Sequence, residues 1–174
     1  DVEDTTKPDG TGSNGVGAII GYAYACDKIK ISNCSVIDST ISGGHWAGGL
    51  IGAAEGYYKE GETGLVFMTI EVSNSKVESS DDGTTIIKSG GSAGGLIGHG
   101  TLNVWTRDEF KDCSVTGCTI TSTGNDTNKA GSLIGTVGAG QTKDDKDGGV
   151  FVTGCTAESN TVTSNGTTID RIFG

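Results

Sequence analysis

The sequence is short of basic residues. It contains 12 Lys and Arg against 22 Asp and Glu, so the net charge at pH 7 is −10. Nucleic acids and anionic membrane surfaces select for basic patches, and the charge therefore argues against both as partners. The acidity is most simply a contribution to solubility.

Long apolar runs and helical periodicity are also lacking. No stretch approaches the roughly 20 apolar residues that a membrane-spanning helix needs, and no apolar pattern of helical period occurs. The opening DVEDTTKPDG has no signal-peptide features and reads as a linker or as the trimmed start of a longer precursor. We expect residues 1–14 to form a tail and residues 15–174 to form one domain of β-strands.

Motifs for metals and nucleotides are missing or incomplete. The chain has no CxxC and only two histidines, which disfavours a zinc site. Residues 92–98 read SAGGLIG, but the helix that follows a phosphate-binding loop is absent. Asp144, Asp145 and Asp147 could hold calcium weakly, although they match no standard calcium loop. We otherwise expect no cofactor.

Glycine, by contrast, is abundant, with 31 residues, and much of it falls in one recurring phrase. The copies are GAIIG at Gly17–Gly21, GGLIG at Gly48–Gly52 and at Gly94–Gly98, GSLIG at Gly131–Gly135, and DRIFG at Asp170–Gly174. The last glycines fall at 21, 52, 98, 135 and 174, so successive copies are 31, 46, 37 and 39 residues apart. Recurrence at such a period indicates a repeat architecture.

Three further columns appear when the repeats are aligned on this phrase. They contain Cys34, Ser75, Cys113 and Cys155; Val36, Val77, Val115 and Ala157; and Ile41, Ile120 and Val162. The two-residue offset between the first two columns places both on one face of a strand, and the polar residues between them face water. We therefore predict an all-β fold, a parallel β-solenoid of about four coils with loops inserted at its corners, in which each glycine phrase marks one strand per coil.

The pattern G-L-x-G followed by I-x-N-C-x-V-x-x-x-x-I resembles the GLUG repeat of bacterial surface proteins. The residues that carry the resemblance are Gly49–Gly52, Gly95–Gly98, Gly131–Gly135 and Ile31–Ile41. Such repeats occur in adhesin-like proteins and in IgA-cleaving peptidases, whose peptidase activity lies outside the repeats. The resemblance implies a right-handed β-helix on the bacterial cell surface that is not an enzyme. It would serve as a stalk or binding segment, whose partner is a protein, a glycan or further domains of the same chain.

Each glycine phrase carries two adjacent apolar residues, which an alternating half-buried strand does not explain. The second members of these pairs are Ile20, Ile51, Ile97, Ile134 and Phe173. Either the protein's own strands and loops cover the outer set, or this set forms an exposed apolar ladder that docks a partner.

Carbohydrate chemistry is the alternative to a purely structural module. Aromatic side chains that could stack on sugars are Trp46, Tyr57, Tyr58 and Trp105. Glycan cleavage would need two carboxylates in one groove, and the sequence does not pair Glu71, Glu78 or Asp108. Ice binding would need a threonine ladder, and Thr40, Thr119 and Thr161 share a column to which the second repeat contributes Ser80.

The five cysteines and two histidines leave further alternatives. Cys113 and Cys155 occupy one column in successive coils, with Cα atoms near ~5 Å apart, so they either remain buried thiols or form a disulfide. His45 and His99 lie on opposite sides of the glycine phrase. We expect them to be unrelated loop residues that do not stack.

Overall fold

The computed structural model of the chain describes residues 2–3, 15–24, 26, 28–55, 68–102, 106–124, 129–139, 149–165 and 167–169. These residues form β-strands and the turns between them, and no helix capable of crossing a membrane occurs among them. The strands assemble into five sheets. Strand pairing in the described residues is parallel, except between β21 and β22.

Four coils follow one another along the chain, and each coil contributes one strand to each sheet. Sheet 1 contains β2 (Gly15–Gly17), β7 (Trp46–Gly48), β12 (Ser92–Gly94) and β17 (Ala130–Gly131). Sheet 2 contains β3 (Ile20–Tyr24), β8 (Ile51–Glu55), β13 (Ile97–Leu102) and β18 (Ile134–Ala139). Sheet 3 contains β4 (Lys28–Ser32), β9 (Met68–Ser73), β14 (Thr106–Lys111) and β19 (Gly149–Thr153).

The remaining two sheets complete each coil. Sheet 4 contains β5 (Ser35–Ile37), β10 (Lys76–Glu78), β15 (Ser114–Thr116) and β20 (Thr156–Glu158). Sheet 5 contains β6 (Thr40–Gly43), β11 (Ile86–Ser89), β16 (Thr119–Ser122) and β21 (Thr161–Ser164). Two short strands extend sheet 5 at its opposite ends, β1 (Val2–Glu3) beside β6 and β22 (Thr167–Ile169) beside β21. The predicted four-coil parallel β-solenoid is confirmed.

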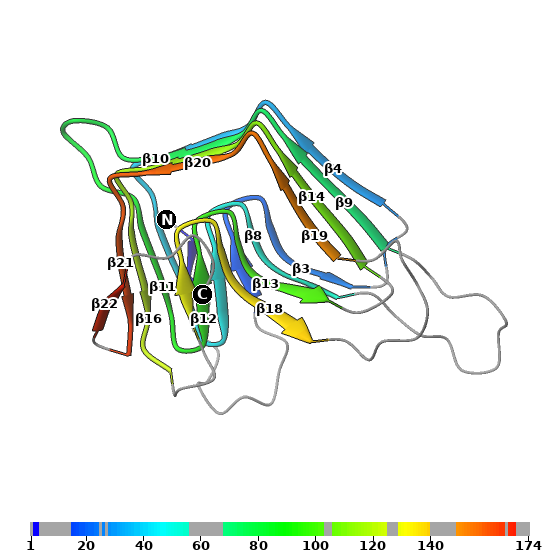
Figure 1. Cartoon of the computed structure of the whole chain (residues 1–174). Coiled ribbons are helices and arrows are strands. Elements are labelled where there is room, and N and C mark those ends of the chain that lie inside the picture. Colours follow the sequence, from blue (N-terminus) through cyan, green and yellow to red (C-terminus); the bar gives the residue numbers. More distant parts are fainter. Residues whose placement is uncertain are drawn as a thin grey trace, which may run out of the picture.

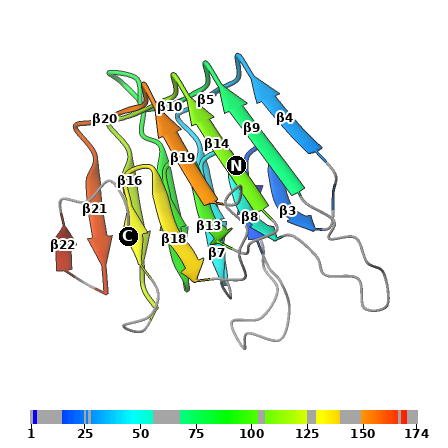
Figure 2. The same ribbon diagram turned by 45° about the vertical axis from the view of Figure 1, so that its right-hand side comes forward.

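The cross-section of the coil is indented. Viewed along the stack, sheet 4 lies across the top, with sheets 3 and 5 on either side (Figure 1). Sheets 1 and 2 run between them and meet at a corner below sheet 4. Figure 2 shows the same stack from the side of sheet 3, with β4, β9, β14 and β19 in succession.

The registers confirm the predicted columns. Val36, Val77, Val115 and Ala157 pair from coil to coil, and so do Ile41, Ile120 and Val162, to which coil 2 contributes Ile87. The cysteine column precedes sheet 4, where the N–H of Lys76 donates to the carbonyl of Cys34 at 2.9 Å. Because identical residues stack, each coil buries the apolar edge of the next.

The prediction that the glycine phrase marks one strand per coil is wrong. Gly48 ends β7 in sheet 1, the chain bends at residues 49–50, and β8 of sheet 2 begins at Ile51. A Cβ added at Gly48 would lie 1.9 Å from the Ile51 carbonyl oxygen, and one at Gly95 would lie 2.0 Å from the Ser132 oxygen. The phrase is thus a tight corner between two sheets, with no room for a side chain at Gly48 or Gly95.

This corner also decides between the two alternatives for the apolar pairs of the glycine phrase. Ile51, Ile97 and Ile134 are fully buried, and so are the neighbouring Leu50 and Leu96. Because the chain bends at each pair, both members point inward in coils 2 to 4, whereas Ile19 in coil 1 is exposed. Ile20 in coil 1 is partly exposed, and Phe173 lies outside the described residues. The protein's own strands therefore cover the ladder.

The predicted threonine column is also corrected. The residue of coil 2 that pairs with Thr40 and Thr119 is Ile86, not Ser80. Ser80 precedes a turn at residues 81–82, which lengthens coil 2 before β11. The threonine ladder that ice binding would require is interrupted at this position.

Candidate functional site

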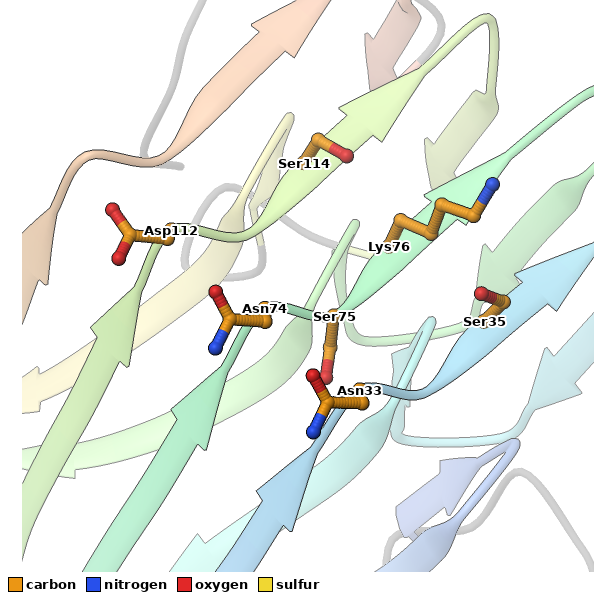
Figure 3. A pocket seen from close by; sticks show the side chains of 7 residues that line it. All are labelled: Asn33, Ser35, Asn74, Ser75, Lys76, Asp112 and Ser114. Carbon is orange, nitrogen blue, oxygen red and sulfur yellow. The ribbon is translucent and has the colours of Figure 1, made fainter.

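The surface is hollowed at the outer corner between sheets 3 and 4. A groove of about 400 Å³ is lined there by Asn33, Ser35, Asn74, Ser75, Lys76, Asp112 and Ser114 (Figure 3). Every lining residue is polar or charged. The residues come from coils 1, 2 and 3, so similar chemical groups recur at the ~4.8 Å spacing between neighbouring strands.

The backbone at this corner explains why asparagine and aspartate line the groove. Asn33, Asn74 and Asp112 have φ values of 55°, 48° and 52°, and Gly154 of coil 4 has 65°. Asn, Asp and Gly adopt this left-handed conformation most readily among the amino acids. Figure 3 shows the three side chains extending from the same side of successive coils.

The groove combines donors and acceptors without a dominant charge. Its amides both donate and accept, the hydroxyls of Ser35 and Ser114 do the same, and Asp112 accepts. The hydroxyl of the buried Ser75 already bonds the backbone of Ser73 and Cys34. Lys76 forms an ion pair with Glu78, and its side chain remains 44% exposed. A Cβ added at Gly154 would lie 2.3 Å from Oδ1 of Asp112, so this carboxylate lies against the glycine of coil 4. The arrangement suits a ligand rich in hydroxyl groups.

None of these groove residues is among the site residues predicted from the sequence. The usable signal was a column of Asn33, Asn74, Asp112 and Gly154, directly before the cysteine column. A column restricted to Asn, Asp and Gly is typical of a position with positive φ. Such a column predicts a corner, and a corner exposes its side chains.

A second cluster lies where sheets 1 and 2 face each other beyond the glycine corner. The Trp46 ring stacks on Tyr22, with centroids 6.2 Å apart, and on His99, with centroids 4.8 Å apart. Tyr22 and His99 belong to coils 1 and 3, and between them coil 2 has the small Ala53. Because neighbouring rings occupy both faces of Trp46, the ring is poorly placed to stack on a sugar, and its predicted role as a glycan platform is not supported by this geometry.

The two histidines are brought to this cluster, contrary to expectation. The His45 ring meets Trp46 edge-on at 4.3 Å, and His99 stacks on the same indole. Burial lowers the pKa of His99, an effect that the Glu55 carboxylate opposes and His45 reinforces. The buried Nδ1 of His99 has no hydrogen-bond partner among the described residues. Burial therefore favours the neutral imidazole.

Asp108 is a buried carboxyl group between sheets 2 and 3. Its neighbours in the sheet 3 column are Ile29, Ile70 and Val150, and in the described part of the chain both of its side-chain oxygens lack hydrogen-bond partners. Burial raises its pKa to about 7. A Cβ added at Gly100 would lie 3.0 Å from Oδ2, so this carboxyl packs closely against the glycine of sheet 2.

The carboxylates considered for glycan cleavage do not converge. Asp108 is fully buried, whereas Glu71 and Glu78 lie on the outer faces of sheets 3 and 4. Glu71 is paired in register with Glu109, but Glu71 bonds Lys28 and Glu109 bonds Arg107. The Lys28 hydrogen bond lowers the pKa of Glu71. A glycosidase acid needs a raised pKa, so Glu71 does not meet this requirement.

Comparison with protein-family models, curated proteins and solved structures finds no match for this chain. The resemblance to the GLUG repeat therefore depends on the motif residues alone and stays a prediction. The function is accordingly inferred from the geometry of the site.

Other predicted site residues lie outside the described part of the chain. They are the sugar-stacking candidates Tyr57, Tyr58 and Trp105, and the calcium candidates Asp144, Asp145 and Asp147. Within the described ranges, no group of three His, Cys, Asp or Glu side chains is placed to hold a metal ion.

Proposed function

We propose that this chain is a non-catalytic, adhesin-type module of a bacterial cell-surface protein. It acts as a rigid spacer, and the groove between sheets 3 and 4 binds a glycan. The single observation that carries this proposal is the groove itself, in which amide, carboxylate and hydroxyl side chains recur over three coils. Sugar hydroxyls both donate and accept hydrogen bonds, which matches these groups.

The spacer role is supported by the way the coils are joined. Backbone hydrogen bonds link each coil to its neighbours through five sheets, and apolar columns fill the interior between them. Such an array is stabilised by contacts between neighbouring repeats, and it can be lengthened by adding coils. The resemblance to surface-protein repeats supports the cell-surface location.

A glycan array, followed by calorimetry with the glycans it identifies, tests binding. The informative variant is Asn74→Gly combined with Asp112→Gly, because glycine keeps the left-handed backbone while removing both groove side chains. We expect this double variant to bind at least about tenfold more weakly, since each lost hydrogen bond to a ligand is worth roughly 1 kcal/mol.

The matched control is Ser159→Gly, which changes an exposed residue of positive φ at the other corner of sheet 4. It should bind like the wild type. Equal binding by the double variant would place the ligand elsewhere on the molecule. Release of glycan fragments during incubation would overturn the non-catalytic assignment, and a wild type that binds no glycan would overturn the glycan assignment.

A further inference from the structure

The cysteine column places two thiols side by side in adjacent coils. Cys34, Ser75, Cys113 and Cys155 occupy equivalent positions just before sheet 4 in coils 1 to 4, because the residues that follow them pair in register. In this column the side chain of one coil accepts a hydrogen bond from the backbone of the coil before it. The N–H of Cys34 donates to Ser75 Oγ at 3.2 Å, and that of Cys113 donates to Cys155 Sγ at 3.4 Å.

Cys113 and Cys155 differ from the other described cysteines in their neighbours. Cys34 faces Ser75 in the next coil. Cys118 belongs to a column at the other corner of sheet 4, where its N–H donates to Asn160 Oδ1 at 2.8 Å. Cys26 lies between β3 and β4, apart from both columns. Within the described residues, therefore, only Cys113 and Cys155 are adjacent members of one column.

The geometry of the pair fits a disulfide. Neighbouring strands of a sheet are ~4.8 Å apart, which lies within the range of about 4.4–6.8 Å between Cα atoms that a disulfide spans. Cys155 Sγ already lies against the backbone N–H of Cys113. Burial raises the pKa of the Cys113 thiol to about 11, and the neighbouring Cys155 adds to this rise. The contact of Cys155 Sγ with the Cys113 backbone brings the two thiols together, and the raised pKa means that Cys113 ionises less readily.

The two thiols also differ in accessibility. Cys113 is 2% exposed, whereas Cys155 is partly exposed on the last described coil. A reagent from solution therefore reaches Cys155 first. Both cysteines are free thiols in the structure.

We propose that Cys113 and Cys155 are a thiol–disulfide exchange site, which a low-molecular-weight disulfide converts into a cross-link between coils 3 and 4. The Cys155 thiolate attacks one sulfur of the small disulfide, and the first small thiol leaves with the proton that Cys155 lost. Cys113 then loses its proton and attacks Cys155 Sγ, and the second small thiol leaves with that proton. Two protein thiols are thus oxidised to one disulfide, and one small disulfide is reduced to two thiols.

The cross-link joins residues 42 positions apart in the chain. Closing such a loop restricts the unfolded chain and so stabilises the folded one. Coil 4 is one of the two less buried ends of the core, since Val150, Val152 and Ala157 are only partly buried. The disulfide therefore fastens an end coil of the described stack to the interior.

Incubating the full chain with oxidised glutathione tests this proposal. We expect the intact mass to fall by two hydrogen atoms, three of the five thiols to remain open to alkylation, and digestion to yield one linked pair of peptides containing Cys113 and Cys155. The melting temperature should rise on oxidation and fall again on reduction.

Cys113→Ser and Cys155→Ser should each abolish the cross-link and the rise in melting temperature. Both should fold, because serine occupies the same column at Ser75. Cys34→Ser is the matched control and should cross-link like the wild type. A lasting glutathione adduct on Cys155 with Cys113 still open to alkylation, a link to any other cysteine, or five unreacted thiols would each overturn the proposal.

Discussion

Asp108 places an ionisable group in the core, in a column otherwise formed by Ile29, Ile70 and Val150. Burial raises its pKa to about 7 in the folded chain, from an ordinary value of 3.8. The folded state therefore holds this proton more tightly than the unfolded state does. The protein is therefore most stable, as far as Asp108 is concerned, below about pH 4, where the carboxyl is protonated in both states. The free energy of unfolding falls as the pH rises to about 7, and above that pH it no longer changes because of this group.

Asp108→Val should stabilise the protein, because valine matches its column and needs no hydrogen bond. A difference of about three pKa units corresponds to roughly 4 kcal/mol, so the advantage of the variant should grow by up to that amount between about pH 4 and about pH 8. Urea unfolding at the two pH values measures it. Asp82→Asn, at an exposed turn, should leave the pH dependence unchanged. Parallel pH profiles for wild type and Asp108→Val would contradict this account of Asp108.

At the scale of the element, the corner between sheets 3 and 4 depends on residues that accept positive φ. Asn74 has a φ of 48°, and its N–H donates to the Lys111 carbonyl of the next coil at 3.0 Å. The corner thus sets the direction of sheet 4 and also exposes the groove side chains. Structure and candidate function therefore depend on the same backbone conformation.

Asn74→Ala and Asn74→Gly separate the effect of backbone conformation on stability from the effect of the side-chain amide. Both variants lack the amide, and only alanine has a Cβ. Alanine should unfold more easily than glycine, by about 1–2 kcal/mol, because a Cβ is disfavoured at positive φ. Denaturant titration of the two variants measures the difference. Equal stabilities would mean that the corner relaxes to another conformation.

The glycine corner makes a stricter demand than the asparagine corner. A Cβ added at Gly95 would lie 2.0 Å from the Ser132 carbonyl oxygen and 2.7 Å from Val115 Cγ1. Coil 4 has Ser132 at the equivalent position, and its sheet 4 column contains the smaller Ala157. The requirement for glycine is therefore specific to the interior of the stack.

Gly95→Ala should cost more than about 3 kcal/mol, because backbone atoms of the next coil would have to move. Ser132→Ala, the same repeat position in coil 4, should change stability by less than about 1 kcal/mol. Thermal unfolding of both proteins provides the comparison. A tolerated alanine at Gly95 would show that the coils can separate without loss of packing.

At the scale of the whole molecule, the stack was predictable from sequence because stacking repeats the same environment. Valine recurs at 36, 77 and 115, and these residues do pair. The glycine corner was not predictable, since a glycine-rich strand and a tight corner leave the same sequence signature. The convergence of His45 and His99 on Trp46 follows from this corner, because the corner brings sheets 1 and 2 against each other. A sequence that does not reveal the corner therefore does not reveal the convergence either.

The site was less predictable than the fold. The groove depends on the positive φ of Asn33, Asn74 and Asp112. The alignment of the repeats suggests this conformation, whereas the overall composition does not. The turn after Ser80 moved Ile86 into the threonine column, because an insertion shifts every later residue of its coil. Features that recur in every repeat can thus be predicted from the sequence, whereas features formed between repeats of unequal length cannot.

The coils should differ in protection from hydrogen exchange. Interior residues of β10 and β15 are fully buried at Val77 and Val115, whereas Ala157 in β20 is only partly buried. We expect the amides of β20 to exchange faster than those of β15, because local opening follows packing. Exchange followed by mass spectrometry of peptides from the two strands measures this. Equal protection would indicate that the four coils open as one unit.

Trp46 lies between rings from the coil before its own and the coil after it. Contacts between neighbouring repeats hold a solenoid together, so each interface between coils ordinarily contributes separately. Here one indole takes part in two interfaces, through Tyr22 of coil 1 and His99 of coil 3. Loss of this single side chain would therefore weaken the attachment of coil 2 to both of its neighbours at once.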